Sequence, residues 1–340
     1  MKKRFPVGVV VFFLLLSQGL WAQKSTVLLK DDISIRSISL YKGKVYYAGS
    51  KSKFGYVNIN RPSDQKQSKV SQPNLEFRSL GRHGKFFYAT SIDTPAFFYK
   101  IDAKTLEATL LGKDQSKSAF YDAIHFTKSG EGWTFSDSDT TCPRIAKFNF
   151  VTETWDMQPC DLLPSISLGE AAFAASNTNI SSVKDRLWIA TGGIKSSILR
   201  RDKEGWKRFE TPFVQGISSS GMYSIDFYSK TQGIAVGGDY TNQSLNKGVI
   251  ATTKDGGETW ELQAEGKNAG YSTCVKYRPG SKGKQIVALG DQHLSYSTDG
   301  GVTWRVLSRV KGLYACEWQN SNTLIAAGLG KILKFDFKGI

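Results

Sequence analysis

The sequence has few of the residues that usually build redox, metal and nucleotide sites. Its 340 residues include 4 Cys and 3 His, and the histidines (His83, His125 and His293) lie far apart along the chain. There is no C-x-x-C or C-x-x-C-H motif and no G-x-G-x-x-G that opens a helix. These absences argue against a bound haem, dinucleotide or metal ion. We therefore expect no cofactor and no metal site.

Long apolar runs are also scarce. The strongest one, residues 5–16, is too short for the ~20 residues that cross a bilayer. It follows the basic residues Lys2, Lys3 and Arg4 and precedes a short segment ending at Ala22, a pattern typical of an export signal. We expect residues 1–22 to be a signal peptide and residues 23–340 to form a single domain. The mature chain would have no membrane span and would be periplasmic or extracellular.

Acidic residues are outnumbered, with 30 Asp and Glu against 45 Lys and Arg and a net charge of +15. Removing Lys2, Lys3 and Arg4 with the signal leaves +12. A basic balance can indicate a nucleic-acid partner, but export argues against one. An acidic protein segment or an acidic glycan is the expected partner.

Glycine and aromatic residues are abundant, with 33 Gly, 20 Phe, 14 Tyr and 8 Trp. Short apolar runs that end in small residues occur seven times, at residues 45–49, 86–90, 132–136, 187–193, 233–238, 286–290 and 324–328. Each run has a strand-like run before it and another after it, and tryptophans mark a fourth strand in several copies. The period of about 45 residues is the size of a propeller blade. The sequence predicts an all-β, seven-bladed β-propeller of four-stranded blades. Residues 26–29 would close the ring by pairing with residues 331–335 in the last blade.

Two turns share the pattern [ST]-x-D-x-G-x-T-W, at residues 253–260 and 297–304. The Asp can accept hydrogen bonds from the turn backbone, the glycines can adopt positive φ, and the Trp can pack over the turn. The pattern resembles the Asp-box (BNR repeat) of sialidase-like propellers, where it serves folding. The corresponding structural residues are Asp255, Gly257, Trp260, Asp299, Gly301 and Trp304.

Further segments resemble a family of exported bacterial propellers related to the photosystem II assembly and stability factor, whose members often carry the label oxidoreductase. The resemblance rests on residues 170–176, 189–193, 219–224 and 233–240 and extends over residues 27–338. It implies a seven-bladed propeller of the Asp-box type. The assembly factor binds protein and has an arginine patch, for which Arg36 and Arg78 are the candidates here.

Alignment of the first strand of each blade, with residues 170–173 as the fourth, places one polar residue per blade at the mouth of the central channel. Convergent polar groups in a cleft are a binding-site hypothesis, although they could also be a self-paired lining of the channel. The candidate binding residues are Arg36, Arg78, Asp122, Glu170, Tyr223 and Tyr314, with Ser272 or Thr273 in the sixth blade.

We favour a non-enzymatic, assembly-factor-like propeller that binds a protein segment or glycan at this mouth. The alternative is a sialidase-like glycoside hydrolase or lyase with Asp122 and Glu170 as its acid and base. Only two arginines are expected in the channel, which argues against the sialidase arginine triad. An oxidoreductase is the least supported activity.

The four cysteines fall into two pairs. Cys142 and Cys160 flank a predicted hairpin and should lie opposite each other at its open end, so we expect them to form a disulfide. Cys274 and Cys316 fall on first strands of neighbouring blades, where we interpret them as small buried apolar residues.

Overall fold

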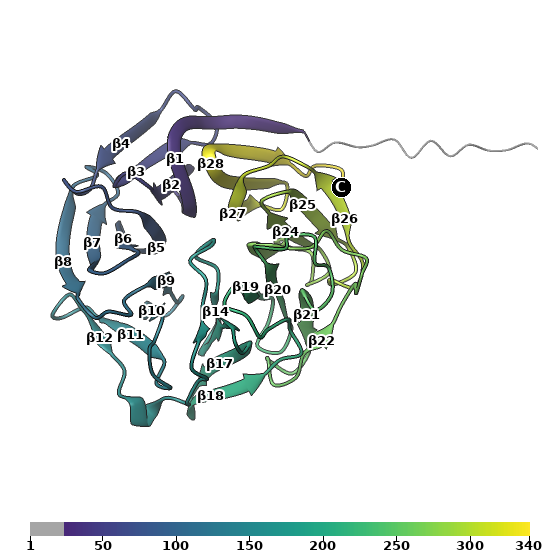
Figure 1. Cartoon of the computed structure of the whole chain (residues 1–340). Helices are drawn as coiled ribbons and strands as arrows, with labels where there is room; N and C mark the ends of the chain where they lie inside the picture. Colours follow the sequence, from purple (N-terminus) through teal and green to yellow (C-terminus); the bar gives the residue numbers. More distant parts are fainter. Residues whose placement is uncertain (1–23) are drawn as a thin grey trace, which may run out of the picture.

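The computed structural model describes residues 24–340, so the predicted signal peptide lies outside the described residues. These residues form 28 strands and one short 3₁₀ helix, and the sheets are arranged as a ring (Figure 1). No helix within residues 24–340 has the length and apolar character needed to cross a membrane.

Each sheet is antiparallel, as expected for neighbouring strands joined by tight turns. Three consecutive sheets contain four strands each. They are β5 (Phe77–His83), β6 (Phe86–Ser91), β7 (Ala96–Asp102) and β8 (Ala108–Asp114); β9 (Tyr121–Phe126), β10 (Gly132–Ser136), β11 (Arg144–Asn149) and β12 (Thr154–Met157); and β14 (Ile180–Val183), β15 (Arg186–Ala190), β17 (Ser197–Asp202) and β18 (Gly205–Glu210). A fourth four-stranded sheet contains β23 (Cys274–Tyr277), β24 (Ile286–Gly290), β25 (His293–Ser297) and β26 (Arg305–Ser308). The helix η1 (Cys160–Leu162) follows β12.

The remaining two sheets contain six strands each. One is ordered β27 (Leu313–Asn320), β28 (Thr323–Asp336), β1 (Ser25–Tyr41), β2 (Lys44–Gly49), β3 (Lys53–Asn58) and β4 (Gln65–Lys69). The other is ordered β13 (Glu170–Ala171), β16 (Gly192–Gly193), β19 (Ser220–Phe227), β20 (Gly233–Asp239), β21 (Ile250–Thr253) and β22 (Glu261–Leu262).

The prediction of seven separate four-stranded blades is therefore wrong, because the strands form six hydrogen-bonded sheets. The main reason is the length of β1, which pairs with β28 along its first half and with β2 along its second half. The predicted contact between the chain ends is present, with Thr26 opposite Lys334 and Val27 opposite Leu333. It lies inside a six-stranded sheet, however, and not in a separate last blade (Figure 1).

A second difference concerns residues 170–173, which were predicted to be the first strand of a blade. The first strand of that four-stranded sheet is instead β14, in which Ile180 pairs with Ile189 of β15. Glu170 and Ala171 form the short strand β13, which joins the neighbouring sheet through Gly192 and Gly193. Small and hydroxylated residues in this stretch give a weak strand pattern, so the sequence assigned the strand about ten residues too early.

The core lies between neighbouring sheets, where aromatic side chains from one sheet pack on the next. Trp188 is fully buried and stacks on Phe227 at 3.7 Å between ring centroids. Its indole N–H donates to the carbonyl of Gly256 at 2.8 Å. The turn of residues 253–260 is therefore joined to the adjacent sheet through the indole N–H of Trp188, because the N–H of a buried Trp needs a hydrogen-bond acceptor.

The two turns of the shared pattern fold in the same way. Asp255 Oδ1 accepts hydrogen bonds from the amides of Glu258 and Thr259, both at 3.0 Å, and from the Thr253 hydroxyl at 2.8 Å. Gly257 has φ of +87°, which favours glycine, and the Trp260 indole donates to its carbonyl at 3.2 Å. In the second turn, Asp299 Oδ1 accepts from the Thr303 amide at 2.9 Å and from the Ser297 hydroxyl at 2.8 Å, and the Trp304 indole donates to the Gly301 carbonyl at 2.8 Å.

Candidate functional site

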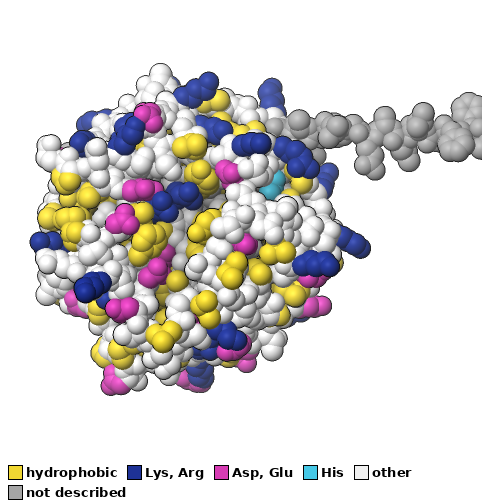
Figure 2. All heavy atoms as spheres, viewed as in Figure 1, with side chains coloured by type: hydrophobic (Ala, Val, Ile, Leu, Met, Phe, Trp, Pro, Cys, Tyr) yellow, Lys and Arg dark blue, Asp and Glu magenta, His cyan; other side chains and the backbone are white. Residues whose placement is uncertain are grey.

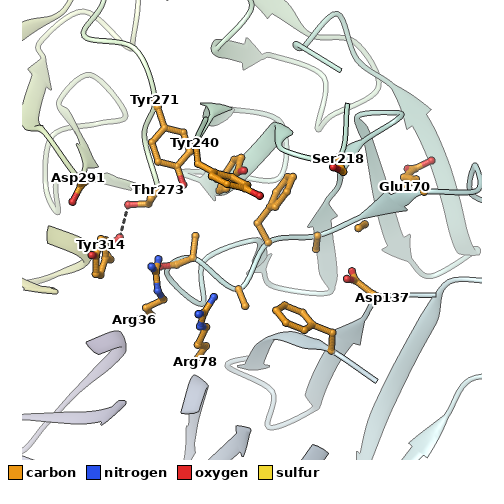
Figure 3. A pocket seen from close by; sticks show the side chains of 18 of the residues that line it. Arg36, Arg78, Asp137, Glu170, Ser218, Tyr240, Tyr271, Thr273, Asp291 and Tyr314 are labelled. Carbon is orange, nitrogen blue, oxygen red and sulfur yellow. Dashed lines mark hydrogen bonds between the residues drawn. The ribbon is translucent and has the colours of Figure 1, made fainter. Parts of the chain in front are cut away.

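The centre of the ring contains two cavities at opposite ends of the same inner strands. Arg36, Arg78 and Tyr223 line the first cavity, which has a volume of about 700 Å³. Residues further along the same strands, such as Leu40, Arg82 and Asp226, line the second cavity of about 480 Å³. The first cavity is the predicted channel mouth (Figure 3).

The segment of residues 172–179 separates the two cavities. Residues 172–175 line the first cavity and residues 176–178 line the second. The Asn177 amide fixes the segment, since Nδ2 donates to the carbonyls of Leu80 and Ile124 at 2.9 and 3.2 Å and Oδ1 accepts from their backbone N–H groups. Asn177 thus hydrogen-bonds to backbone groups of two inner strands, and the segment of residues 172–179 forms the floor of the first cavity.

Arg36 is the most unusual charged residue of the first cavity. Its guanidinium carbon lies 4.1 Å from the centre of the Tyr314 ring, and Nη1 donates to the carbonyl of Ala175 at 3.4 Å. Nε has no hydrogen-bond partner, and within residues 24–340 Arg36 forms no ion pair. Burial, together with the positive charge of Arg78, lowers the pKa of Arg36. A partly buried positive charge without a counter-ion favours an anionic ligand.

Arg78 lies beside Arg36 in the cavity wall, as Figure 3 shows. Its Nε donates to Glu76 Oε1 at 2.6 Å, and both side chains remain partly exposed. One of the two arginines is therefore balanced by a carboxylate of the chain, and the other is not.

Aromatic rings form another wall of the first cavity. Tyr223 stacks on Phe173 with ring centroids 3.8 Å apart and meets the edge of Tyr271 at 4.9 Å. Its hydroxyl donates to the carbonyl of Ser219 at 2.7 Å. Burial raises the pKa of both Tyr223 and Tyr271, so both hydroxyls stay protonated at neutral pH. Tyr223 and Tyr271 are buried, so the aromatic surface open to a ligand comes from Phe173, which is partly exposed, and from Tyr240, which is exposed at the rim.

The carboxylate of Asp137 lines the first cavity at the place where the sequence predicted Asp122. Asp122 is fully buried behind the surface, and neither of its oxygens has a hydrogen-bond partner. Burial and the nearby Asp137 raise the pKa of Asp122, and burial raises the pKa of Asp137 to about 7. Asp137 follows Ser136, which pairs with Tyr121 next to Asp122. This strand register is the signal that could have identified Asp137 from the sequence. Using it requires knowledge of the exact pairing of the two strands.

Glu170 lines the cavity but its carboxylate is occupied by the chain. Oε2 accepts from Arg208 Nη2 and from the Ser167 amide, both at 3.0 Å. Oε1 accepts from the hydroxyls of Thr191, at 2.7 Å, and Ser197. This network connects β13 to the adjacent four-stranded sheet, so the contacts of Glu170 are structural.

Of the residues predicted for the ring, Arg36, Arg78, Glu170, Tyr223, Tyr314 and Thr273 line one cavity, and Asp122 lies behind it. Thr273 donates to the carbonyl of Tyr314 at 2.6 Å, which joins two neighbouring inner strands. Their roles in binding stay predictions. Five residues of the cavity were not predicted from the sequence, and all of them lie in segments that connect strands: Asp137, Phe173, Tyr240, Tyr271 and Asp291.

The predicted disulfide is present between Cys142 and Cys160, whose Cα atoms are 5.6 Å apart. The partly buried His125 contacts the Ser182 hydroxyl at 2.7 Å, and desolvation lowers its pKa to about 4. Within residues 24–340, no group of three His, Cys, Asp or Glu side chains is arranged to hold a metal ion.

No family model and no curated protein sequence matches this chain. Solved structures do match, at low identity. A structure of YCF48 bound to a D1 peptide has a TM-score of 0.64 at 13% identity and covers 93% of this chain and 96% of its own. YCF48 from Cyanidioschyzon merolae has a TM-score of 0.64 at 12% identity, covering 92% and 98%. The WD40 β-propeller domain of Doa1 has a TM-score of 0.62 at 11% identity, covering 92% and 96%. These likenesses show that the fold is a β-propeller.

Proposed function

We propose that this chain is an exported, non-enzymatic propeller that binds an acidic protein segment in the first cavity. The observation that carries the proposal is the partly buried guanidinium of Arg36, whose buried Nε has no hydrogen-bond partner and which has no ion-pair partner within residues 24–340. A ligand carboxylate would supply the missing counter-ion and could bind the planar guanidinium with two hydrogen bonds. Arg78 adds a second positive charge beside it.

The shape and walls of the cavity support a peptide as the ligand. A volume of about 700 Å³ accommodates a few side chains, and the rings of Phe173 and Tyr240 provide apolar contact surface, with Tyr223 buried behind Phe173. The similar YCF48 structure contains a bound peptide, which supports a protein segment over a glycan. Lys and Arg are dispersed among acidic side chains on the face in Figure 2, so attraction would be concentrated in the cavity.

The enzymatic alternative receives less support from the geometry. A hydrolase pair would need both carboxylates free to face the substrate. Glu170 accepts hydrogen bonds from four groups of the chain, and Asp122 has no exposed surface. The arrangement therefore favours binding over hydrolysis.

Export is part of the proposal and has two supports. The basic and apolar pattern of residues 1–22 is typical of a signal peptide, and a disulfide such as Cys142–Cys160 is typical of proteins in an oxidising compartment. Fractionation of the source cells, with detection of the mature N-terminus by mass spectrometry, tests the location directly.

The binding proposal is tested with the Arg36→Gln variant. An array of peptides from the exported proteins of the source organism, with free and amidated C-termini, identifies bound acidic segments. We expect Arg36→Gln to weaken binding of those segments at least tenfold, because a charge-assisted contact is lost. The matched control is Arg305→Gln, an exposed arginine on β26 that should leave affinity unchanged. Equal affinity of both variants, or binding to acidic glycans and to no peptide, would contradict the proposal.

A further inference from the structure

Four large apolar side chains are exposed on segments that border the first cavity. They are Leu168, Ile194, Ile217 and Tyr240, which are 63%, 44%, 52% and 54% exposed, and we call them the apolar rim. Gly169, next to Leu168, and Ser218, next to Ile217, line the cavity, as Tyr240 itself does. Single exposed apolar residues are ordinary on a protein surface, whereas a group of them beside a cavity is typical of a binding surface.

Backbone hydrogen bonds place the four segments of the apolar rim side by side. The N–H of Ile194 donates to the carbonyl of Gly169 at 3.1 Å, and the N–H of Gly216 donates to the carbonyl of Gly193 at 2.9 Å. Ser220, which follows Ile217 by three residues, pairs with Asp239, the residue before Tyr240. The four side chains therefore follow one another along one side of the cavity.

The backbone beneath the apolar rim is fixed. A Cβ added to Gly193 would lie 2.4 Å from the carbonyl oxygen of Gly169, so the two segments can approach this closely only because residue 193 is glycine. Two hydrogen bonds of 3.0 Å close the turn that presents Leu168, from the N–H of Glu170 to the carbonyl of Ser167 and from the N–H of Ser167 to the carboxylate of Glu170. A ligand that binds to a preformed surface does not have to order a loop first.

Exposed charge is scarce on this side of the cavity. Among the eight residues next to the rim residues in the sequence, only Asp239 and Lys195 are charged. Asp239 is buried, and Lys195 Nζ lies 4.0 Å from the carboxylate of Glu210. The two arginines of the cavity lie across it from Tyr240 (Figure 3). One ligand would therefore meet positive charge on one side of the cavity and apolar surface on the other.

We propose that the apolar rim belongs to the peptide site and that the partner is an amphipathic acidic segment. An Asp or Glu of that segment binds Arg36, and a large aliphatic or aromatic residue beside it in the sequence packs on Leu168 and Ile217. The inference rests on the proposed binding of an acidic segment and adds a requirement for apolar neighbours. Binding would remove the exposed apolar surface from water, which favours the complex. A purely acidic segment would leave this surface exposed, and a neutral one would leave Arg36 without a counter-ion.

The test uses two libraries of short synthetic peptides, with Glu at the central position in one, Gln in the other, and all other positions randomised. The mature protein is immobilised, and the peptides that it binds are sequenced by mass spectrometry. From the Glu library we expect enrichment of Leu, Ile, Phe and Met at the positions next to Glu. We expect Leu168→Ser and Ile217→Ser each to weaken binding of the selected peptides about tenfold, because an apolar contact is lost.

Leu110→Ser is the matched control for Leu168→Ser. Leu110 is 50% exposed on β8, the outer strand of another sheet, so its replacement should leave the affinity unchanged. Salt dependence separates the two parts of the recognition. Added salt should weaken binding to Leu168→Ser by the same factor as binding to the wild type, because Arg36 is intact, and should weaken binding to Arg36→Gln by less. Circular dichroism verifies that each variant is folded.

Three results would overturn the inference. The first is selection of Glu peptides without any apolar preference beside Glu, which would leave the proposed binding of acidic segments intact. The second is equal affinity of the wild type, Leu168→Ser and Ile217→Ser for the selected peptides. The third is a wild-type dimer in sedimentation velocity that both variants abolish, since a second copy would then cover the apolar rim. Equal capture from the Glu and Gln libraries would instead contradict the proposed function, and this inference with it.

Discussion

At the scale of single residues, two side chains of the first cavity are charged groups that the fold has not paired. Arg36 has no ion-pair partner in the described part of the chain, and one oxygen of Asp137 is buried without a hydrogen-bond donor. Buried polar groups without partners cost stability. Such a cost is commonly tolerated at functional sites, where a ligand completes the contacts.

The raised pKa of Asp137 makes a prediction about stability and pH. The folded pKa of about 7 lies above the ordinary value of 3.8, so protonation favours the folded state. The contribution of Asp137 to the free energy of unfolding is therefore largest below pH 4, and it is lost as the pH rises through about 7. One pKa unit corresponds to about 1.4 kcal/mol, so Asp137→Asn should stabilise the protein by a few kcal/mol at pH 8 and by much less at pH 5. Urea unfolding at both values measures the difference.

Asp139→Asn is the matched control, since Asp139 is exposed two residues away. It should change stability little at either pH. An equal effect of Asp137→Asn at pH 8 and pH 5 would show that the titration of Asp137 does not contribute.

At the scale of elements, the two turns of residues 253–260 and 297–304 show how a short motif connects sheets. Each turn satisfies its own backbone through one Asp and brings its Trp over the turn. The first turn also accepts the Trp188 indole N–H from the adjacent sheet. Loss of the Asp would therefore affect both the turn and the contact between sheets.

We predict that Asp255→Ala destabilises the protein by about 1.5–3 kcal/mol, the range for hydrogen bonds to a charged group. The amides of Glu258 and Thr259 would lose their acceptor. Lys254→Ala, an exposed change in the same turn, should stay within about 0.5 kcal/mol of wild type. Chemical denaturation compares the two variants, and similar stabilities would rule out this role for the carboxylate.

At the scale of the whole molecule, β1 connects the two ends of the chain. Its first half pairs with β28 and its second half with β2, while Leu28, Leu29 and Ile33 pack into the core beneath. The six-stranded sheet that results is continuous across the chain ends (Figure 1).

Deleting residues 24–30 should therefore lower the melting temperature markedly. The deletion removes the pairing with residues 331–335 and two buried leucines, each worth about 2–5 kcal/mol. Val27→Ala, at a position 46% exposed on the same strand, should have a small effect. Calorimetry of the three proteins tests this, and an unchanged transition after the deletion would contradict it.

Much of the local structure could be predicted from the sequence. The period of apolar runs predicted strands near those observed, the turn pattern predicted the contacts of Asp255 and Asp299, and hairpin geometry predicted the Cys142–Cys160 disulfide. Each depends on residues close in sequence. The number of sheets could not be predicted in the same way, because it depends on whether one long strand is hydrogen-bonded on both edges.

The same distinction between local and long-range determinants applies to the candidate site. By itself, the sequence determined that Arg36, Arg78, Tyr223 and Tyr314 would converge, because a repeated period places equivalent residues of successive inner strands around one centre. Only the tertiary structure decided that Asp137 would line the cavity with Asp122 behind it, that Glu170 would be held by Arg208, and that residues 172–179 would divide the channel. The physical reason is that these outcomes depend on burial and on partners distant in the chain, which local sequence patterns do not specify.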